Sequence, residues 1–276
     1  MSPTPADVPR VDGMPQLGFG TWENDDHDQC AASVETALDI GYRHIDTAQI
    51  YRNEAAVGDG IAESSVARDE IFLATKVWIT NLGADDVLSS TDDSLERLGT
   101  DYLDLLYVHW AAGEYDPEET LAAFEQLHEA GKVERIGVSN FEPEHLDRAQ
   151  EELDIPIFAN QIELHPFLRQ EQLREYASEA GINLVAYSPL ARGNVIDDPV
   201  IGEIAEKYGV SEPQVSLAWL RSKGITAIPK ATSEEHIQDN WQSLSLDLEA
   251  EDIERIDSRD RKLRTVNPDF GPEGWE

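Results

Sequence analysis

The chain has 276 residues, and 40% of them are hydrophobic, which is enough to bury one sizeable core. Its 56 acidic residues against 21 basic ones give a net charge of −35, which repels phosphate and argues against a nucleic-acid partner. No apolar run reaches the roughly 18 residues of a membrane span, so we expect no membrane partner.

The acidic residues are spread along the whole chain, which is typical of a solvated surface. Such a surface repels itself in dilute buffer, and molar salt screens that repulsion. We therefore expect a protein from a halophile, with an acidic mesophilic protein as the alternative. The first residues lack the charged-then-apolar pattern of a signal peptide, which predicts a cytoplasmic protein. The single cysteine, Cys30, excludes an intrachain disulfide and a thiolate metal site, and we expect it to be buried and inert.

Apolar runs typical of buried strands alternate with helical patterns along the chain. The expected strands cover residues 16–22, 43–47, 71–78, 103–110, 134–140, 157–164, 183–190 and 225–231. The expected helices lie near residues 28–40, 53–67, 84–98, 117–130, 143–152, 169–180, 199–222 (one or two helices) and 233–242. Eight such units predict the α/β class and one (β/α)8 TIM barrel domain over residues 1–276. A tail at 258–276, rich in Pro and Gly, is expected to pack near the barrel mouth.

Polar side chains end three consecutive strands of this predicted barrel. Asp46 ends the second strand, Lys76 the third and His109 the fourth, while Tyr51 lies in the loop after the second. Because the carboxyl ends of barrel strands meet at one mouth, we expect these four side chains to converge there. Each residue alone has a plain structural explanation, and the joint arrangement is what favours a catalytic site.

The four residues suit the reduction of a carbonyl group. A phenol has a pKa near 10, so we expect the Lys76 ammonium, held by Asp46, to lower the pKa of Tyr51. Tyr51 would then protonate the carbonyl oxygen as hydride reaches the carbon. His109 would hydrogen-bond the substrate carbonyl and fix its orientation.

The later strand ends favour a nicotinamide cofactor. No G-x-G-x-x-G motif is present, which argues against a Rossmann domain. Ser139, Asn140 and Gln161 could bind a carboxamide, and Tyr187 could stack on a flat ring. Lys230 precedes the last expected helix. We expect Thr232 and Glu235 to form a capping box at the start of this helix. The helix N-terminus together with Lys230 could bind a phosphate group.

Eight motifs in order make the sequence similar to the aldo-keto reductases over nearly its whole length. They are GFGTW (18–22), GYRHIDTAQIYRNE (41–54), LATKVW (73–78), DLLYVHW (104–110), IGVSNF (136–141), NQIELHP (160–166), AYSPLARG (186–193) and IPKAT (228–232). The resemblance implies a monomeric (β/α)8 barrel that reduces aldehydes and ketones with NADPH. It also implies a catalytic tetrad of Asp46, Tyr51, Lys76 and His109, with Tyr51 as the general acid.

The resemblance matches several cofactor candidates and departs from the family in one place. Our complete set of cofactor-binding candidates is Ser139, Asn140, Gln161, Tyr187, Ser188, Leu190, Lys230, Ala231, Thr232, His236 and Asn240. Where the family reads Lys-Ser followed by an arginine, this chain has Lys230-Ala231 and His236. Glu234 and Glu235 stand beside them and would repel a 2′-phosphate. NADPH is the expected cofactor, with NADH or dual use as the alternative.

Three tryptophans follow strand ends and predict an apolar substrate pocket. Trp22, Trp78 and Trp110, with His109, are the expected substrate-binding residues, and Phe270 and Trp275 in the tail are expected to cover them. Ordinary core packing is the alternative for the tryptophans. Two other functions compete with a reductase: a regulatory cofactor-binding subunit on the same fold, and a metalloenzyme using His109 and His165. No metal-ligand spacing supports the latter, so no metal is expected.

Overall fold

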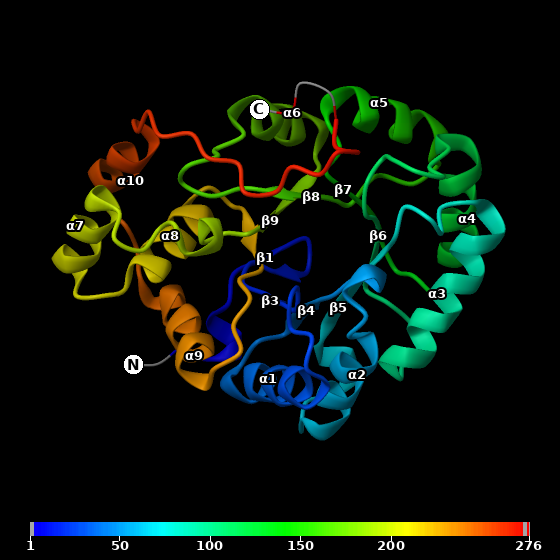
Figure 1. The fold of residues 1–276 in the computed structure, drawn as a ribbon, viewed down its shortest axis with the longest axis horizontal. Helices are drawn as coiled ribbons and strands as arrows, with labels where there is room; N and C mark the ends of the chain where they lie inside the picture. Colours follow the sequence, from blue (N-terminus) through cyan, green and yellow to red (C-terminus); the bar gives the residue numbers. More distant parts are fainter. Residues whose placement is uncertain (1–2, 273–274, 276) are drawn as a thin grey trace.

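An eight-stranded parallel sheet forms the centre of the computed structural model, which describes residues 3–272 and Trp275 (Figure 1). Each strand pairs with the next along the chain, and the prediction of a (β/α)8 barrel is confirmed. The strands are β3 (Phe19–Gly20), β4 (His44–Asp46), β5 (Phe72–Val77), β6 (Leu105–Val108), β7 (Ile136–Ser139), β8 (Ala159–Glu163), β9 (Asn183–Tyr187) and β10 (Thr226–Ala227).

Isolated bridges close the barrel between its first and last strands. Leu17 pairs with Ala227, and Gly20 pairs with Lys230, both in the parallel sense. A Cβ atom at Gly20 would lie 2.6 Å from the carbonyl oxygen of Ile228. Only glycine allows the two backbones to approach this closely, which explains why GFG opens the first strand.

Helices surround the sheet, as Figure 1 shows. They are α1 (His27–Ile40), α2 (Glu54–Glu63), α3 (Ala84–Leu98), α4 (Pro117–Glu129), α5 (Pro143–Glu152), α6 (Glu171–Ala180), α7 (Pro199–Tyr208), α8 (Glu212–Ser222), α9 (Glu234–Gln242) and α10 (Ala250–Asp257). The segment 199–222 thus forms two helices. Among the described residues, no helix is long and apolar enough to cross a bilayer.

Local signals place the helix ends. Asp116 caps α4 by accepting a hydrogen bond from the backbone N–H of Glu119 at 3.0 Å, and Pro117 occupies the first turn. The predicted capping box at Thr232 is wrong, because α9 begins one residue later. Ser233 is its N-cap and accepts from the N–H of His236 at 3.3 Å.

Besides short 3-10 helices, two elements were not expected from the sequence. One is the hairpin of β1 (Arg10–Val11) and β2 (Met14–Pro15), and the other is α10. The hairpin turns at Asp12-Gly13, where both residues have positive φ, as a tight two-residue turn requires. It places the fully buried Met14 against apolar residues of the barrel interior, among them Phe72 and Leu105.

Most of the apolar core lies between the sheet and the helices, and a smaller cluster fills the barrel. Cys30 is buried in α1, as expected, and burial followed by the nearby Asp25 raises the pKa of its thiol to about 11. The thiol is therefore protonated and unreactive at neutral pH. Charged side chains are buried too, at the carboxyl ends of the strands: Asp46, Lys76 and Glu163. A buried charge requires partners, and these charges gather at the carboxyl ends of the strands. We therefore look for the functional site there.

Candidate active site

Asp46 and Lys76 form a buried ion pair across the adjacent strands β4 and β5. The Lys76 ammonium donates to the Asp46 carboxylate and also to the carbonyl oxygen of Thr47 at 2.8 Å. Gln161, from β8 across the barrel, donates to the other Asp46 oxygen at 2.8 Å. The carboxylate is therefore fixed from two sides, and it holds Lys76 in one position beneath the mouth.

Tyr51 lies over this pair, in the short 3-10 helix η2 (Gln49–Tyr51) that follows β4. Its ring centroid is 5.1 Å from the Lys76 ammonium and 5.9 Å from that of the His109 ring. The expectation that Lys76 lowers the pKa of Tyr51 is wrong in this structure. Burial, and then the negative charge of Asp46, raise that pKa well above its usual value. Tyr51 therefore keeps its proton at neutral pH.

His109 follows β6 and is buried beside Tyr51. Burial, and then the charge of Lys76, lower the pKa of its imidazole well below the usual value, so the ring is neutral. Its Nδ1 atom has no hydrogen-bond partner among the described residues. The backbone carbonyl of His109 accepts from the Asn140 side chain at 3.2 Å, which ties this residue to β7. A neutral imidazole can donate one N–H to a carbonyl oxygen.

The candidate carboxamide binders form a single network. Ser139 donates its hydroxyl to the backbone carbonyl of Gln161 at 2.8 Å and accepts from the Asn140 amide at 3.0 Å. Tyr187 donates its hydroxyl to the Asn140 side-chain oxygen at 2.8 Å. Asn140 has a φ of 61°, a left-handed conformation that asparagine tolerates better than most residues. The network orients the Tyr187 ring along the wall of the mouth.

One cavity of about 560 Å³ unites these side chains. The predicted residues that line it are Trp22, Asp46, Tyr51, Trp78, His109, Trp110, Asn140, Gln161, Tyr187, Ser188, Leu190 and Lys230. Lys76 and Ser139 do not line it but contact side chains that do. The amides, the Tyr187 ring and the Lys230 ammonium give it the chemistry that a nicotinamide dinucleotide needs, so the residues present fit that cofactor.

Besides Ser139, four predicted cofactor residues lie outside this lining: Ala231, Thr232, His236 and Asn240. Ala231 and Asn240 are buried, whereas His236 is exposed in the first turn of α9. Glu234 and Glu235 are exposed in the same turn. The first turn of α9 is thus an open surface and not an enclosed pocket.

Aromatic side chains form one wall of the cavity. Trp78 packs edge-on against His109, with centroids 5.1 Å apart, and against Phe270, at 5.8 Å. Phe270 also meets Trp110 at 5.4 Å, and Val266 and Pro268 continue the wall. The tail therefore supplies one side of the cavity.

Sequence reasoning missed the segment 188–198, here called the strap, as a structural unit of the site. Arg192 and Gly193 line the cavity, and the Arg192 guanidinium lies 4.3 Å from the centroid of Trp22, across the mouth. Besides glycine, the strap contains four residues with positive φ: Ser188, Ala191, Arg192 and Asp197. Such backbone strain persists only where the surroundings hold the chain in place. Apart from the Arg-Gly pair, the local sequence contains no signal that predicts the conformation of the strap.

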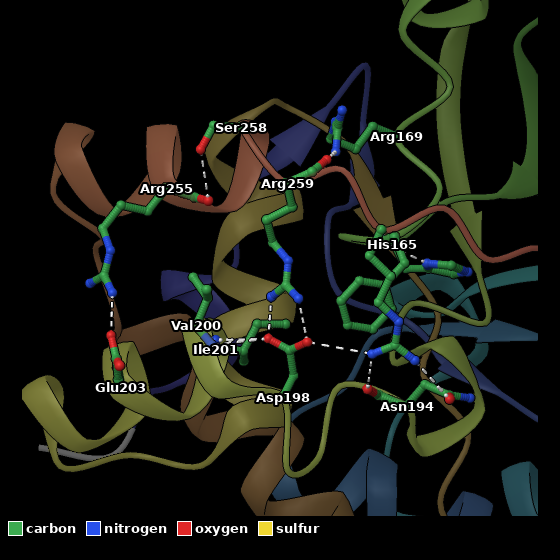
Figure 2. Close-up of polar contacts among 12 residues, drawn as sticks. His165, Arg169, Asn194, Asp198, Val200, Ile201, Glu203, Arg255, Ser258 and Arg259 are labelled. Carbon is green, nitrogen blue, oxygen red and sulfur yellow. Dashed lines mark hydrogen bonds and ion pairs between the residues drawn. The ribbon is translucent and has the colours of Figure 1, made fainter.

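Figure 2 shows how the tail holds the strap. Asp198 is buried, caps α7 through the N–H groups of Val200 and Ile201, and pairs with Arg259 through both carboxylate oxygens. Arg261 reaches the same carboxylate and donates to the Asn194 side chain at 3.1 Å. Both arginines belong to the tail, so two walls of the cavity are fastened to each other.

The described residues form no candidate metal site. Throughout the described residues, no group of three or more His, Cys, Asp or Glu side chains is placed to hold a metal ion. His165 does not face His109 as a co-ligand; its Nε2 atom is 2.9 Å from a Glu163 oxygen.

Comparison with known proteins places this geometry in one family. The sequence profile described as "Aldo/keto reductase family" matches residues 16–261. Glyoxal reductase of Bacillus subtilis is 42% identical over 257 residues, which are 93% of each chain. Methylglyoxal reductase DkgB of Escherichia coli O157:H7 is 40% identical over 266 residues, which cover 95% of this chain and 99% of that protein.

Solved structures agree with the sequence matches. An aldo/keto reductase from Brucella melitensis superposes with a TM-score of 0.86 at 41% identity, covering 91% of this chain and 98% of that one. A Bombyx mori aldo-keto reductase in complex with NADP gives a TM-score of 0.88 at 32% identity, covering 94% and 95%.

Proposed function

Because the chain belongs to the aldo/keto reductase family, we propose that it reduces aldehydes and ketones to alcohols, with Tyr51 as the proton donor. The observation that supports this most is the convergence of Tyr51, His109 and the Asp46–Lys76 pair on one cavity. A neutral phenol and a neutral imidazole meet there beside a fixed cation.

These residues divide the work of reduction among them. The reduced nicotinamide supplies hydride to the carbonyl carbon when it is bound. A neutral His109 N–H orients the carbonyl oxygen, and the Tyr51 hydroxyl donates its proton to that oxygen as negative charge develops on it. The Lys76 ammonium, 5.1 Å from the Tyr51 ring, then stabilises the phenolate that remains. Its effect is thus exerted on the product state, since the resting phenol keeps a high pKa.

NADPH is the principal cofactor in this proposal, with NADH as the alternative. Lys230 lines the cavity and supplies one permanent cation for a phosphate. His236, in place of a permanent cation, and the exposed Glu234 and Glu235 weaken that preference. The other function considered, a non-catalytic cofactor-binding subunit, gains no support from the relatives, which are reductases by name.

Replacement of Tyr51 by phenylalanine tests the proposal. Because a positioned general acid contributes about 10²–10⁴-fold, we expect Tyr51→Phe to lower kcat by roughly 10³-fold. Glyoxal and methylglyoxal, the aldehydes in the relatives' names, are the first substrates to measure, in molar potassium chloride. Cofactor affinity, followed by quenching of tryptophan fluorescence, should be unchanged.

Tyr176→Phe is the matched control. Tyr176 lies on the surface of α6, where its hydroxyl donates to the carboxylate of Asp147. This variant should retain full activity. Turnover by Tyr51→Phe at the rate of Tyr176→Phe would show that the proton comes from another group.

A further inference from the structure

Glu163 is a buried carboxylate at the mouth that plays no part in the proton transfer described above. It is the last residue of β8, two positions after Gln161. Side chains two apart in a strand share a face, so β8 directs Gln161 toward Asp46 and Glu163 toward the same mouth, one step higher. Its side chain is fully buried. A carboxylate removed from water in this way is costly unless hydrogen bonds replace the water.

The tail supplies most of these hydrogen bonds. One Glu163 oxygen accepts from the backbone N–H of Thr265 at 2.6 Å and from its hydroxyl at 2.7 Å. The other accepts from the N–H of Val266 at 2.9 Å. His165 Nδ1 accepts from the N–H of Phe167 at 3.2 Å, so His165 Nε2 carries the proton that it donates to Glu163.

These hydrogen bonds overcome the cost of burial. Burial by itself would raise the pKa of the Glu163 carboxyl, but the hydrogen bonds from His165, Thr265 and Val266 outweigh it and leave the pKa below its usual value. The group is therefore a carboxylate at neutral pH, with acceptors only. Four donors converge on it, three of them from two adjacent tail residues.

Glu163 holds the part of the tail that forms one wall of the cavity. Val266 both donates to Glu163 and lines the cavity, and Phe270, four residues later, packs against Trp78 and Trp110. On its other side the tail is fastened by Arg259 to Asp198 (Figure 2) and by the N–H of Leu263 to the carbonyl of Phe167 at 2.9 Å. Glu163 is thus the anchor nearest to the aromatic wall.

We propose that Glu163 is a positioning residue that fixes the tail wall of the cavity and thereby selects for carbonyl substrates large enough to touch it. This inference rests on the proposed reductase function. A flat aromatic aldehyde would lie against Phe270, Trp78 and Trp110, whereas methylglyoxal is too small to need that wall. Loosening the tail should therefore weaken the binding of the first and spare the second.

Glu163→Gln is the direct test, because glutamine keeps the volume but presents an N–H group to donors of the tail. Since differences in pocket contact typically change selectivity by ~10-fold or more, we expect the KM for benzaldehyde to rise about 10-fold. Turnover of methylglyoxal and the affinity for NADPH should stay within about twofold of wild type, well under the 1.4 kcal/mol of a tenfold change.

Two further variants separate positioning from general damage. Glu179→Gln removes the same charge from an exposed residue of the next helix, α6, and it should leave the KM for both aldehydes unaffected. Phe270→Ala removes the wall itself. If Glu163 acts through the wall, adding Glu163→Gln to the Phe270→Ala protein should raise the KM for benzaldehyde by less than about twofold.

The outcomes are distinct. Equal losses for both aldehydes, no change for either, or additive effects with Phe270→Ala would each overturn the inference while leaving the reductase function intact. A wild-type protein without carbonyl reduction would instead overturn the proposed function. The anchor would then be tested by hydrogen exchange of the tail: Glu163→Gln should speed exchange within residues 263–272, and unchanged exchange there would refute the anchor itself.

Discussion

Lys76 illustrates how a single buried charge organises the residues around it. An ammonium with no exposed surface must be paired, and its carboxylate partner must in turn be held by a third group. Asp46 and Gln161 meet these two needs from β4 and β8. A lysine at the end of an apolar run is therefore informative in a sequence, because few structural roles require one there.

The first turn of α9, where we propose that a 2′-phosphate binds, offers a prediction at the scale of one residue. His236 is exposed at the first turn of α9, so His236→Arg adds a permanent cation without disturbing the core. If the 2′-phosphate binds there, the added cation would meet only that group, so we expect the Kd of NADPH to fall about 10-fold and that of NADH to stay unchanged. Titration of each cofactor by fluorescence gives both values.

Gln238→Arg is the control for that change. It adds the same charge two residues further along α9, which points away from the face of His236. Equal tightening of both cofactors by His236→Arg, or the same effect from Gln238→Arg, would mean that the phosphate binds elsewhere.

At this scale the sequence predicted which side chains meet but not their protonation. Asp46, Tyr51, Lys76 and His109 end up together because register and strand order are fixed by the pattern of apolar runs. The pKa of Tyr51 depends on burial and on its distance from the charge of Asp46, neither of which a linear sequence contains. The role of Tyr51 as proton donor stays a prediction, and the direction predicted for its pKa shift is wrong in this structure.

Among the elements, long periodic segments were predictable and short ones were not. The helices expected at 84–98, 117–130 and 143–152 agree with the structure within a residue. The strands β3 and β10 contain two residues each where seven were expected, because regular pairing is interrupted at the seam of the barrel. The hairpin β1–β2 was missed although Asp12-Gly13 is a turn signal, since its strands have only two residues each.

The contact between strap and tail makes a prediction about stability. Asp198 is 2% exposed and receives two arginines and two backbone N–H groups. Breaking a buried pair costs about 3–5 kcal/mol, so Asp198→Ala should lower the free energy of unfolding by at least about 3 kcal/mol. Asp198→Asn retains a capping oxygen and should cost less. Urea unfolding in molar salt measures both.

Asp197 provides the comparison for this change. It is exposed, has positive φ and neighbours Asp198, and asparagine tolerates that conformation. Asp197→Asn should leave the unfolding midpoint unchanged. An Asp198→Ala protein as stable as Asp197→Asn would show that the tail does not fasten the strap.

For the whole molecule, the net charge of −35 predicts a dependence on salt. At about 0.1 M salt the screening length is about 10 Å, and at about 1 M it is about 3 Å, so repulsion among surface carboxylates fades over this range. We expect the unfolding temperature to rise between 0.1 and 2 M potassium chloride (about 10 and 2 Å of screening). Scanning calorimetry follows it directly.

Choline chloride distinguishes screening from specific ion binding. If screening is the cause, choline and potassium should stabilise to a similar extent, because only ionic strength matters. Stabilisation by potassium alone would indicate bound ions instead. An unfolding temperature that does not change with either salt would contradict the expectation of a protein adapted to high salt.

The seam of the barrel has a consequence for how the molecule is made. The bridges of Leu17 to Ala227 and Gly20 to Lys230 join parts of the chain separated by about 200 residues, a long loop to close. A nascent chain in which the residues from 226 onward are still inside the ribosome can form seven strands but cannot join the ends of the sheet. It presents two unpaired edges to every neighbouring chain. Pairing of β10 with the first strand closes the barrel and removes both unpaired edges. Until that step, the newly synthesised chain remains prone to aggregation.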